Sequence, residues 1–183
     1  DFFDNSEASK QIFNNLDETM GLKLSELIFN GSEEELSKTT NSQPAIMSLS
    51  IAILEEINAR GLLDDKKIHS VAGHSLGEYT SLTALNSLSL TDTAKLLRLR
   101  GKAMQNSFPS GEGSMAAILG LDVDKVRETI NFSGIKNVCQ IANDNAPGQV
   151  VVSGNVESLK TLIQLAKDSG IRKIIPLSVS APF

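Results

Sequence analysis

Apolar and polar residues in the first part of the chain follow the spacing of amphipathic helices. This spacing predicts short helices over residues 6–21 and 32–38. Ser32 and Glu35 form a capping-box pattern, in which each side chain satisfies a free N–H group of the other residue. The second of these helices should therefore begin directly after Ser32.

A longer helix is predicted from Pro44 to about Arg60, because proline suits the first helical position and Gly61 can end the helix. Its apolar residues recur at helical spacing along one face: Ile46, Leu49, Ile53 and Ile57. Another helix is expected to start at Thr91, which can cap it, and to run to about Ser107.

A short apolar segment lies between these two helices. Residues 68–72 are predicted to form a buried strand, followed by a tight turn at residues 73–77 and a helix over residues 78–85. A strand that leads through a tight turn into a helix is typical of α/β proteins.

The second half of the chain changes to short strands that alternate with helices. Strands are predicted over residues 115–121, 137–142, 149–153 and 172–177. Helices over residues 122–130 and 156–169 separate the first strand from the second and the third from the fourth. The dense turn cluster at residues 143–148 would join the middle strands as a hairpin. The order β-α-β-β-α-β is that of a ferredoxin-like unit.

Together these elements predict an α/β fold, with a hydrolase-like parallel-sheet main body and an inserted ferredoxin-like α+β subdomain. Residues 1–113 are assigned to the main body, residues 114–177 to the subdomain, and residues 178–183 to a return into the main body. The chain begins at Asp1 without a methionine and ends at Phe183 just after a predicted strand. We therefore expect it to be truncated at both ends.

Composition narrows the class of protein. The 183 residues carry 17 Lys+Arg against 22 Asp+Glu, a net charge of −5, and 40% are hydrophobic, as in ordinary soluble globular proteins. No apolar run reaches the roughly 18 residues of a membrane span, and the acidic balance argues against nucleic acid as a partner. Cys139 is the single cysteine, which excludes an intramolecular disulfide and fits a reducing compartment. We expect it to be inert packing.

Candidate chemistry centres on residues 73–77, Gly-His-Ser-Leu-Gly, a G-x-S-x-G pattern between a predicted strand and a predicted helix. In such a nucleophile elbow the serine has strained backbone geometry and an exposed hydroxyl, and a Cβ at Gly73 or Gly77 would collide with the neighbouring strand or helix. Ser75 would be a nucleophile at a helix N-terminus, with the N–H of Leu76 as an oxyanion donor. An ordinary turn is the alternative interpretation of so short a motif.

A serine nucleophile needs a general base, and the chain has two histidines. His74 is adjacent to Ser75, but on an elbow its side chain leaves in another direction. His69 lies on the predicted strand and is interpreted as a packed core or edge residue. Either Ser75 is not catalytic, or its base lies beyond residue 183.

Five ordered stretches of sequence carry a resemblance to a known family. They are residues 73–78, 98–105, 113–121, 143–154 and 176–183. In this order they resemble the nucleophile motif, the R-G-x-x-M-Q helix, the entry into the subdomain, the N-x-N-x-P-G-Q-V-V stretch and the segment before the catalytic histidine of one family. That family is the malonyl-CoA:acyl carrier protein transacylases and the related acyltransferase domains of polyketide and fatty-acid synthases.

The resemblance implies a function and two missing parts. It implies transfer of a malonyl group from malonyl-CoA, through a malonyl ester of Ser75, to the phosphopantetheine thiol of acyl carrier protein in type II fatty-acid biosynthesis. Leu76 would be one oxyanion donor. The family's second oxyanion segment, G-Q-G-S-Q, would precede Asp1, and its catalytic histidine would directly follow Phe183.

The resemblance also implies a set of substrate-binding residues: Arg100, His74, Phe183, Asn143 and Gln43. Arg100 would hold the malonyl carboxylate through two charge-assisted bonds, whereas periodicity alone favours a solvated helix arginine. Phe183 aligns with a bulky position that accompanies malonyl over methylmalonyl, or it simply fills core. Turn chemistry alone can account for Asn143, and an N-cap role for Gln43.

The remaining expectations follow from the same resemblance. No metal or organic cofactor is implied, since coenzyme A enters as a substrate. We expect malonyl-CoA and acyl carrier protein as partners, no nucleic acid or membrane, a monomer, and a cytoplasmic location.

Two other functions stay open. A serine esterase or thioesterase of the α/β-hydrolase type would take its acid from Asp122, Asp124 or Asp144. A non-catalytic module that binds carrier protein would not need Ser75.

Overall fold

The computed structural model describes residues 5–64, 67–109, 111–134, 139–168, 173–177, 179 and 182–183. The chain forms two compact units, Asp1–Ala103 and Met104–Phe183. Each unit has its own elements and its own core, and each is described by itself below.

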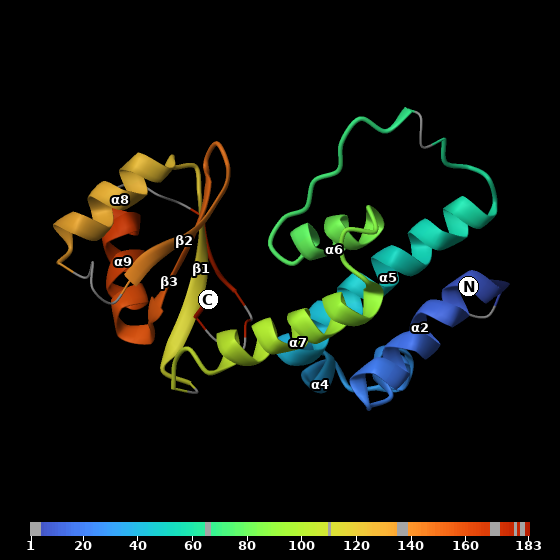
Figure 1. Cartoon of the computed structure of the whole chain (residues 1–183). Coiled ribbons are helices and arrows are strands. Elements are labelled where there is room, and N and C mark those ends of the chain that lie inside the picture. Colours follow the sequence, from blue (N-terminus) through green and yellow to red (C-terminus); the bar gives the residue numbers. More distant parts are fainter. Residues whose placement is uncertain are drawn as a thin grey trace. The chain divides into compact units, whose positions relative to one another are not determined.

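The described residues of the first unit form helices and no strand (Figure 1). The helices are α2 (Glu7–Met20), α3 (Leu24–Asn30), α4 (Glu33–Ser37), α5 (Thr39–Ala59), α6 (Gly77–Ala84) and α7 (Leu90–Gln105), the last of which ends just beyond the unit boundary. Side-chain caps start three of them. Ser6 accepts a hydrogen bond from the Ser9 N–H at 3.0 Å, Ser32 accepts one from the Glu35 N–H at 3.2 Å, and Ser89 accepts one from the Asp92 N–H at 3.0 Å, so the cap predicted at Thr91 is wrong. The helices predicted over residues 6–21 and 32–38 are confirmed, and α3 was not predicted.

The core of the first unit lies between α2, α5 and α7. Its buried apolar residues are Leu16, Met20, Met47, Ile51, Ala94 and Leu97. Gly101 allows α7 to approach α5 closely, because a Cβ at this position would lie 2.7 Å from the Thr39 carbonyl oxygen. This close packing fixes α7 against α5 at the residue next to Arg100.

The longer predicted helix differs from α5 at its start. α5 begins at Thr39, so the predicted start at Pro44 is wrong. The Lys38 carbonyl accepts the N–H groups of Asn41 and Ser42 at 2.8 Å each, which forms a helical turn before the proline. The predicted end is confirmed, since α5 stops at Ala59 and is followed by a glycine with a φ of 65°.

The apolar face predicted on this helix is not the face that packs in the first unit. Ile46 and Leu49 are 53% and 46% exposed, whereas Met47 and Ile51 on the other side are buried. Helix α5 is thus apolar on more than one side, and the contacts with α2 and α7 decide which side is buried in this unit.

The buried strand predicted over residues 68–72 is wrong for the described structure. These residues form no strand, and Ile68 and Val71 are exposed. A buried parallel strand needs hydrogen-bonded strands beside it, and the described residues of the first unit contain none. His69 is also exposed, so its interpretation as a packed histidine is wrong, and the predicted parallel sheet is not observed among these residues.

The second unit contains a four-stranded antiparallel sheet with two helices (Figure 1). The elements are β1 (Gly113–Leu119), α8 (Val123–Phe132), β2 (Cys139–Ala146), β3 (Gln149–Asn155), α9 (Val156–Asp168) and β4 (Lys173–Leu177). The strands lie in the order β2-β3-β1-β4, and every neighbouring pair is antiparallel. The predicted succession of strands and helices is confirmed.

The hairpin between β2 and β3 is tighter than the sequence predicted. β2 continues to Ala146, so the turn cluster predicted at residues 143–148 is wrong except at Pro147 and Gly148. Gly148 has a φ of 77°, a conformation that glycine adopts without a steric penalty. Two register shifts in the pairing of β2 with β3 fall within the last six residues of β2. Such bulges keep polar residues in a ladder that their type alone does not favour.

Both faces of the sheet carry apolar residues. On the helical face a buried cluster joins the sheet to α8 and α9: Ala116, Ile118, Val126, Ile130, Cys139, Val150, Val152, Leu159 and Leu162. Burial raises the pKa of the Cys139 thiol to about 11, so the thiol stays protonated and unreactive at neutral pH. On the other face Met115, Ala117 and Val151 form a smaller cluster.

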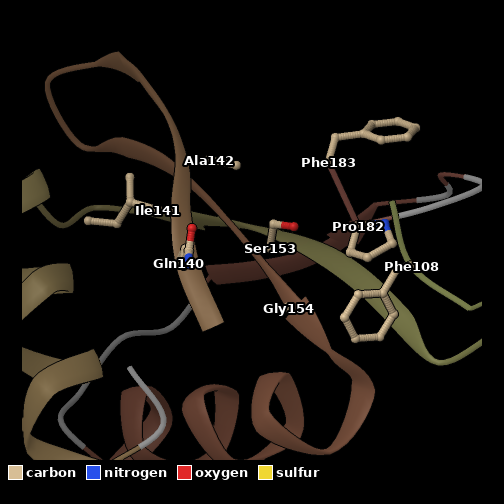
Figure 2. Close-up of a pocket in the computed structure, with 8 residues that line it drawn as sticks. All are labelled: Phe108, Gln140, Ile141, Ala142, Ser153, Gly154, Pro182 and Phe183. Atoms are coloured by element: carbon tan, nitrogen blue, oxygen red, sulfur yellow. The ribbon is translucent and has the colours of Figure 1, made fainter. Parts of the chain in front are cut away.

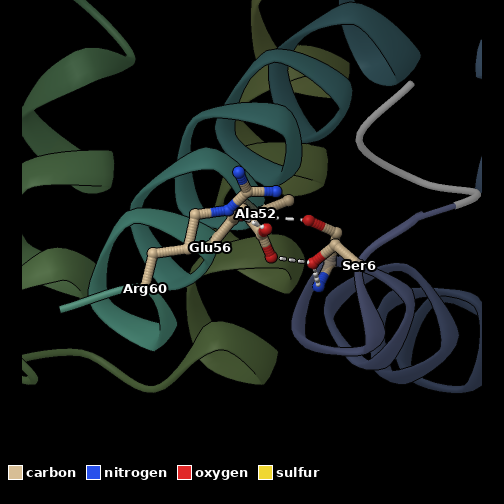
Figure 3. A network of polar contacts seen from close by, with 5 residues as sticks. Ser6, Ala52, Glu56 and Arg60 are labelled. Carbon is tan, nitrogen blue, oxygen red and sulfur yellow. Dashed lines mark hydrogen bonds and ion pairs between the residues drawn. The ribbon is translucent and has the colours of Figure 1, made fainter. Parts of the chain in front are cut away.

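A polar network ties the start of α2 to α5 (Figure 3). The Ser6 hydroxyl and Arg60 Nε both donate to the Glu56 carboxylate, the latter at 2.6 Å, and the Ser9 hydroxyl donates to the Ala52 carbonyl at 3.2 Å. The bond from Ser6, and then the bond from Arg60, hold the pKa of Glu56 below its ordinary value of 4.5.

This network predicts a loss of stability at acid pH. Because the folded-state pKa of Glu56 is lowered, its contribution to stability is present above about pH 4.5 and is lost as the pH falls through the folded-state pKa. In Glu56→Gln the free energy of unfolding should therefore depend less steeply on pH below this value than in the wild type. Urea titrations between about pH 3 and pH 7 measure it.

Glu55→Gln is the matched control, since it removes an exposed carboxylate from the neighbouring position of the same helix. It should retain the wild-type pH dependence. If the free energy of unfolding depends on pH equally steeply in Glu56→Gln and in the wild type, the assignment of this acid sensitivity to Glu56 is contradicted.

Candidate active site

The Gly-His-Ser-Leu-Gly segment forms a sharp turn that leads into α6. Ser75 is exposed and has a φ of 56°, a left-handed conformation that non-glycine residues rarely adopt. The turn is closed by two backbone hydrogen bonds, from the Gly77 N–H to the His74 carbonyl at 2.9 Å and from the Glu78 N–H to the Ser75 carbonyl at 3.2 Å. The predicted strained turn with an exposed serine hydroxyl is confirmed, and so is the helix that follows it.

The two glycines of the motif have different surroundings. A Cβ at Gly73 would lie 1.9 Å from the carbonyl carbon and oxygen of Gly77 and 2.4 Å from the Glu78 nitrogen. A Cβ at Gly77 would have no described atom within 4 Å. The prediction that both positions exclude a side chain is therefore correct for Gly73 and wrong for Gly77. The asymmetry arises because a Cβ at Gly73 would point at the backbone of Gly77, whereas a Cβ at Gly77 would point away from Gly73.

Leu76 is the N-cap residue of α6, with a φ of −60° and a ψ of −22°. Its carbonyl accepts the Thr80 N–H at 3.2 Å, and its side chain packs against the core of the first unit. The N–H of Leu76 therefore lies at the N-terminal end of a helix, where backbone donors and the helix dipole favour negative charge. Its role as an oxyanion donor stays a prediction.

Arg100 reaches the serine from α7. Its Nη2 donates to Ser75 Oγ at 3.0 Å, and its Nη1 donates to Gln43 Oε1. Gln43 is only 4% exposed, so its amide is a buried anchor for the guanidinium group. The interpretation of Arg100 as a solvated helix arginine is therefore wrong. An N-cap role for Gln43 is also wrong, since the N-cap of α5 is Lys38.

Tyr79 also contacts this arginine and was not predicted as a site residue. The Arg100 Cζ lies over the Tyr79 ring, 5.9 Å from its centroid. Tyr79 lies in the first turn of α6, four residues after Ser75. No local pattern marked it, because the contact forms only where α7 brings Arg100 close to α6.

The described contacts of Ser75 include a hydrogen-bond donor but no general base. A guanidinium group stays protonated and has no lone pair to accept a proton, so Arg100 cannot activate the serine as a base. His74 and His69 are both exposed. What the arrangement can do is hold an anion next to Ser75 Oγ, because a guanidinium group anchored on two sides is a rigid receptor for a carboxylate.

Asn143 and Phe183, the other two candidates, belong to the second unit. Asn143 is a half-buried residue of β2, paired with Val151 of β3. Phe183 packs against the apolar cluster of Met115, Ala117 and Val151, as its interpretation as a core-filling residue predicted. Any contact of either residue with substrate stays a prediction.

A pocket of about 360 Å³ opens on the second unit next to Phe183 (Figure 2). Phe108, Pro182 and Phe183 lie at one side of the pocket, and Gln140 and Ile141 lie at the other. Ala142, Ser153 and Gly154 complete its lining. Its walls are thus of mixed polar and apolar character.

Among the described residues, no group of three or more His, Cys, Asp or Glu side chains could hold a metal ion. None of the described helices is long and apolar enough to cross a membrane.

Comparison with known proteins identifies the family. The model of the acyl transferase domain family matches residues 3–177, and the chain belongs to this family. The serine on a strained turn before a helix, and the arginine that donates to its hydroxyl, thus belong to an acyltransferase-family chain.

Within this family the chain is similar to malonyl transferases. It is 43% identical, over its whole length and 57% of the relative, to the malonyl CoA-acyl carrier protein transacylase of Bacillus subtilis (strain 168). Its structure matches the acyl-carrier-protein-S-malonyltransferase from Bartonella henselae with a TM-score of 0.92 and 44% identity, over 100% of this chain and 58% of that one.

A third match is a type II polyketide-synthase acyl-carrier protein in complex with its malonyl-transacylase. It has a TM-score of 0.91 and 33% identity, over 100% of this chain and 58% of that one. The chain thus spans somewhat more than half the length of the relatives it matches. These matches confirm an α/β fold of the malonyltransferase type.

Proposed function

We propose that the protein transfers a malonyl group from malonyl-CoA to the phosphopantetheine thiol of acyl carrier protein, as its relatives are named for doing. The observation that carries the proposal is the hydrogen bond of 3.0 Å from Arg100 Nη2 to Ser75 Oγ. It joins an exposed serine on a strained turn to a fixed cation. This pair suits a substrate whose acyl group ends in a carboxylate.

The proposed reaction has two steps, each of which exchanges one acyl bond. Ser75 Oγ attacks the thioester carbonyl of malonyl-CoA, an ester bond to the serine forms, and the carbon–sulfur bond breaks to release coenzyme A as its thiol. The carrier-protein thiol then attacks the malonyl-serine ester, a new thioester forms, and the serine hydroxyl is released. In both steps a histidine of the family pattern, outside the contacts described here, would move the proton.

The remaining residues take supporting parts in this proposal. The Leu76 N–H would stabilise the oxyanion at the end of α6. Gln43 would hold Arg100 rather than touch the substrate, since its Oε1 is already bonded to Nη1. His74, Asn143 and Phe183 would line the acyl site, and the size of Phe183 would favour malonyl over a branched acyl group.

The proposal extends to the architecture and the setting of the full-length protein. Residues 1–113 and 178–183 would belong to a hydrolase-like main body with a parallel sheet. Residues 114–177 would be a ferredoxin-like subdomain, which the strand order β2-β3-β1-β4 supports. The protein would act as a cytoplasmic monomer in type II fatty-acid biosynthesis, with coenzyme A thioester as substrate and no metal or organic cofactor.

Arg100→Ala tests the role of the carboxylate. A charge-assisted hydrogen bond contributes about 1.5–3 kcal/mol, so kcat/KM for malonyl-CoA should fall roughly 10- to 150-fold. The rate with acetyl-CoA should change far less, because acetyl has no carboxylate to bind. Transfer of each acyl group to carrier protein, measured by intact mass spectrometry on the full-length variant, gives both numbers.

Two further variants sharpen this test. Arg100→Lys should recover only part of the malonyl rate, since an ammonium group cannot form a parallel pair of bonds to a carboxylate. Lys102→Ala removes an exposed cation two residues further along α7 and should leave both rates unchanged. Equal losses with acetyl-CoA and malonyl-CoA in Arg100→Ala would count against the carboxylate role.

The exposed Ser75 also fits an esterase or thioesterase. Intact mass spectrometry after incubation with malonyl-CoA separates these functions. A malonyl adduct that persists until carrier protein is added supports the transferase. Rapid release of malonate without carrier protein supports the hydrolase. No reaction at all supports a module that only binds carrier protein.

A further inference from the structure

Arg100 is held from three directions by residues of α5, of the turn before α6 and of α6. Gln43 of α5 accepts from Nη1, Ser75 in the turn before α6 accepts from Nη2, and Arg100 Cζ lies over the ring of Tyr79 on α6. The two polar contacts fix the guanidinium nitrogens. Of these three contacts, the one with Tyr79 is not a hydrogen bond and acts through the face of the aromatic ring.

The contact with Ser75 weakens during the reaction. Once Ser75 carries an acyl group, its oxygen is an ester oxygen, which is a poorer acceptor than a hydroxyl, and the Nη2 donor of Arg100 would turn to the stronger acceptor, the substrate carboxylate. At that stage Gln43 and Tyr79 are the described contacts left to hold the arginine. Gln43 alone leaves the guanidinium group free to swing about the bond to Nη1.

Tyr79 is well placed to prevent this movement. Its ring is partly buried against the apolar cluster of α2, α5 and α7, so it cannot follow the arginine if the arginine moves. A guanidinium group within about 6 Å of an aromatic centroid is attracted to the ring face, and the attraction grows when water is excluded. The distance of 5.9 Å from Cζ to the centroid lies inside this limit.

From this geometry we propose that Tyr79 is a positioning residue that sets the selectivity for a carboxylate-bearing acyl group, by holding the guanidinium group of Arg100 over its ring while Ser75 is acylated. The inference rests on the proposed function, since it concerns how Arg100 selects malonyl. It also gives a reason for a tyrosine in the first turn of α6, four residues after the nucleophile. The turn then places the acylated oxygen, and the helix that follows it holds the cation that meets the far end of the acyl group.

The test compares Tyr79→Phe and Tyr79→Leu in the full-length protein, with malonyl-CoA and acetyl-CoA as the probes. Tyr79→Phe keeps the aromatic face and should stay within about twofold of the wild type on both substrates. Tyr79→Leu keeps an apolar side chain against the core but loses the ring. Its kcat/KM for malonyl-CoA should fall about 2- to 30-fold, mainly through KM, while acetyl-CoA transfer stays within about twofold.

A double variant shows whether Tyr79 acts through the arginine. In Tyr79→Leu/Arg100→Ala, malonyl transfer should be no slower than in Arg100→Ala alone, because the tyrosine has no guanidinium group left to hold. A structural readout accompanies the kinetics. The ring-current shift of the Arg100 side-chain protons in the NMR spectrum should persist in Tyr79→Phe and disappear in Tyr79→Leu.

The outcomes separate this inference from the proposed function. If Arg100→Ala loses the preference for malonyl-CoA but Tyr79→Leu keeps it, the role of Tyr79 is overturned and the proposed function stands. Equal losses on both substrates in Tyr79→Leu, or additive losses in the double variant, also overturn it. If Arg100→Ala itself keeps the preference, the carboxylate role of Arg100 fails, and the role of Tyr79 fails with it.

Discussion

Ser75→Ala should abolish covalent loading by malonyl-CoA. The variant lacks the only atom that can form the proposed ester, and loss of a serine nucleophile typically costs roughly 10⁴- to 10⁶-fold in rate. Intact mass spectrometry of the full-length protein after incubation with malonyl-CoA should show no adduct, and transfer to carrier protein should fall to background. The fold should survive, because the exposed hydroxyl contributes to no core contact.

Ser70→Ala is a suitable control for this experiment. Ser70 is exposed and lies five residues before the nucleophile, so its removal tests for adventitious acylation of a nearby hydroxyl. It should load malonyl at the wild-type rate. An adduct that persists in Ser75→Ala and vanishes in Ser70→Ala would refute the assignment of the nucleophile.

The second large effect is expected from Gly73→Ala. Its new methyl group would lie 1.9 Å from backbone atoms of Gly77, which cannot yield as a flexible side chain could. The turn must open to relieve this clash, and Ser75 moves with it. Since a displacement of about 1 Å can cost roughly 100-fold in rate, acylation should slow at least to that extent. The free energy of unfolding should also fall, and urea titration measures it.

Gly77→Ala makes a closely matched comparison within the same motif. A Cβ at this position meets no described atom within 4 Å, and its φ is not positive. Alanine also has a higher helix propensity than glycine, and this position is the first residue of α6. Acylation and stability should therefore stay close to those of the wild type. Similar defects in the two variants would show that the asymmetry of the turn does not govern the site.

The sequence was most informative where the type of a single residue determines the structure of the residues next to it. The serine caps at Ser6 and Ser32, the glycine after α5 and the motif at residues 73–77 each produce their structure through contacts within a few residues. The succession of strands and helices after residue 113 was also readable, because alternating strands and amphipathic helices differ in period. The β2–β3 hairpin was misread because polar residues that usually form turns are held in β2 by bulged pairing with β3.

The site residues also differ in whether a local pattern could identify them. The motif itself marked Ser75 and Gly73, and the resemblance to a family marked Arg100. The bond between Arg100 and Gln43 joins residues 57 positions apart in the chain, and no local pattern could show that these side chains meet. The contact of Tyr79 with Arg100 was missed for the same reason. The prediction for Gly77 was wrong because the two glycines have equivalent places in the motif but different surroundings in the structure.

By itself, then, the sequence determined the strained turn that exposes Ser75, because the conformation of a five-residue segment depends mainly on its own glycines and the helix that follows. Only the tertiary structure decided what lies beside the serine. The packing of α7 on α5, which Gly101 permits, brings Arg100 onto Ser75, Gln43 and Tyr79. Tertiary packing also decided that residues 68–72 form no strand here, since a strand needs hydrogen-bonded neighbours that no segment can supply for itself.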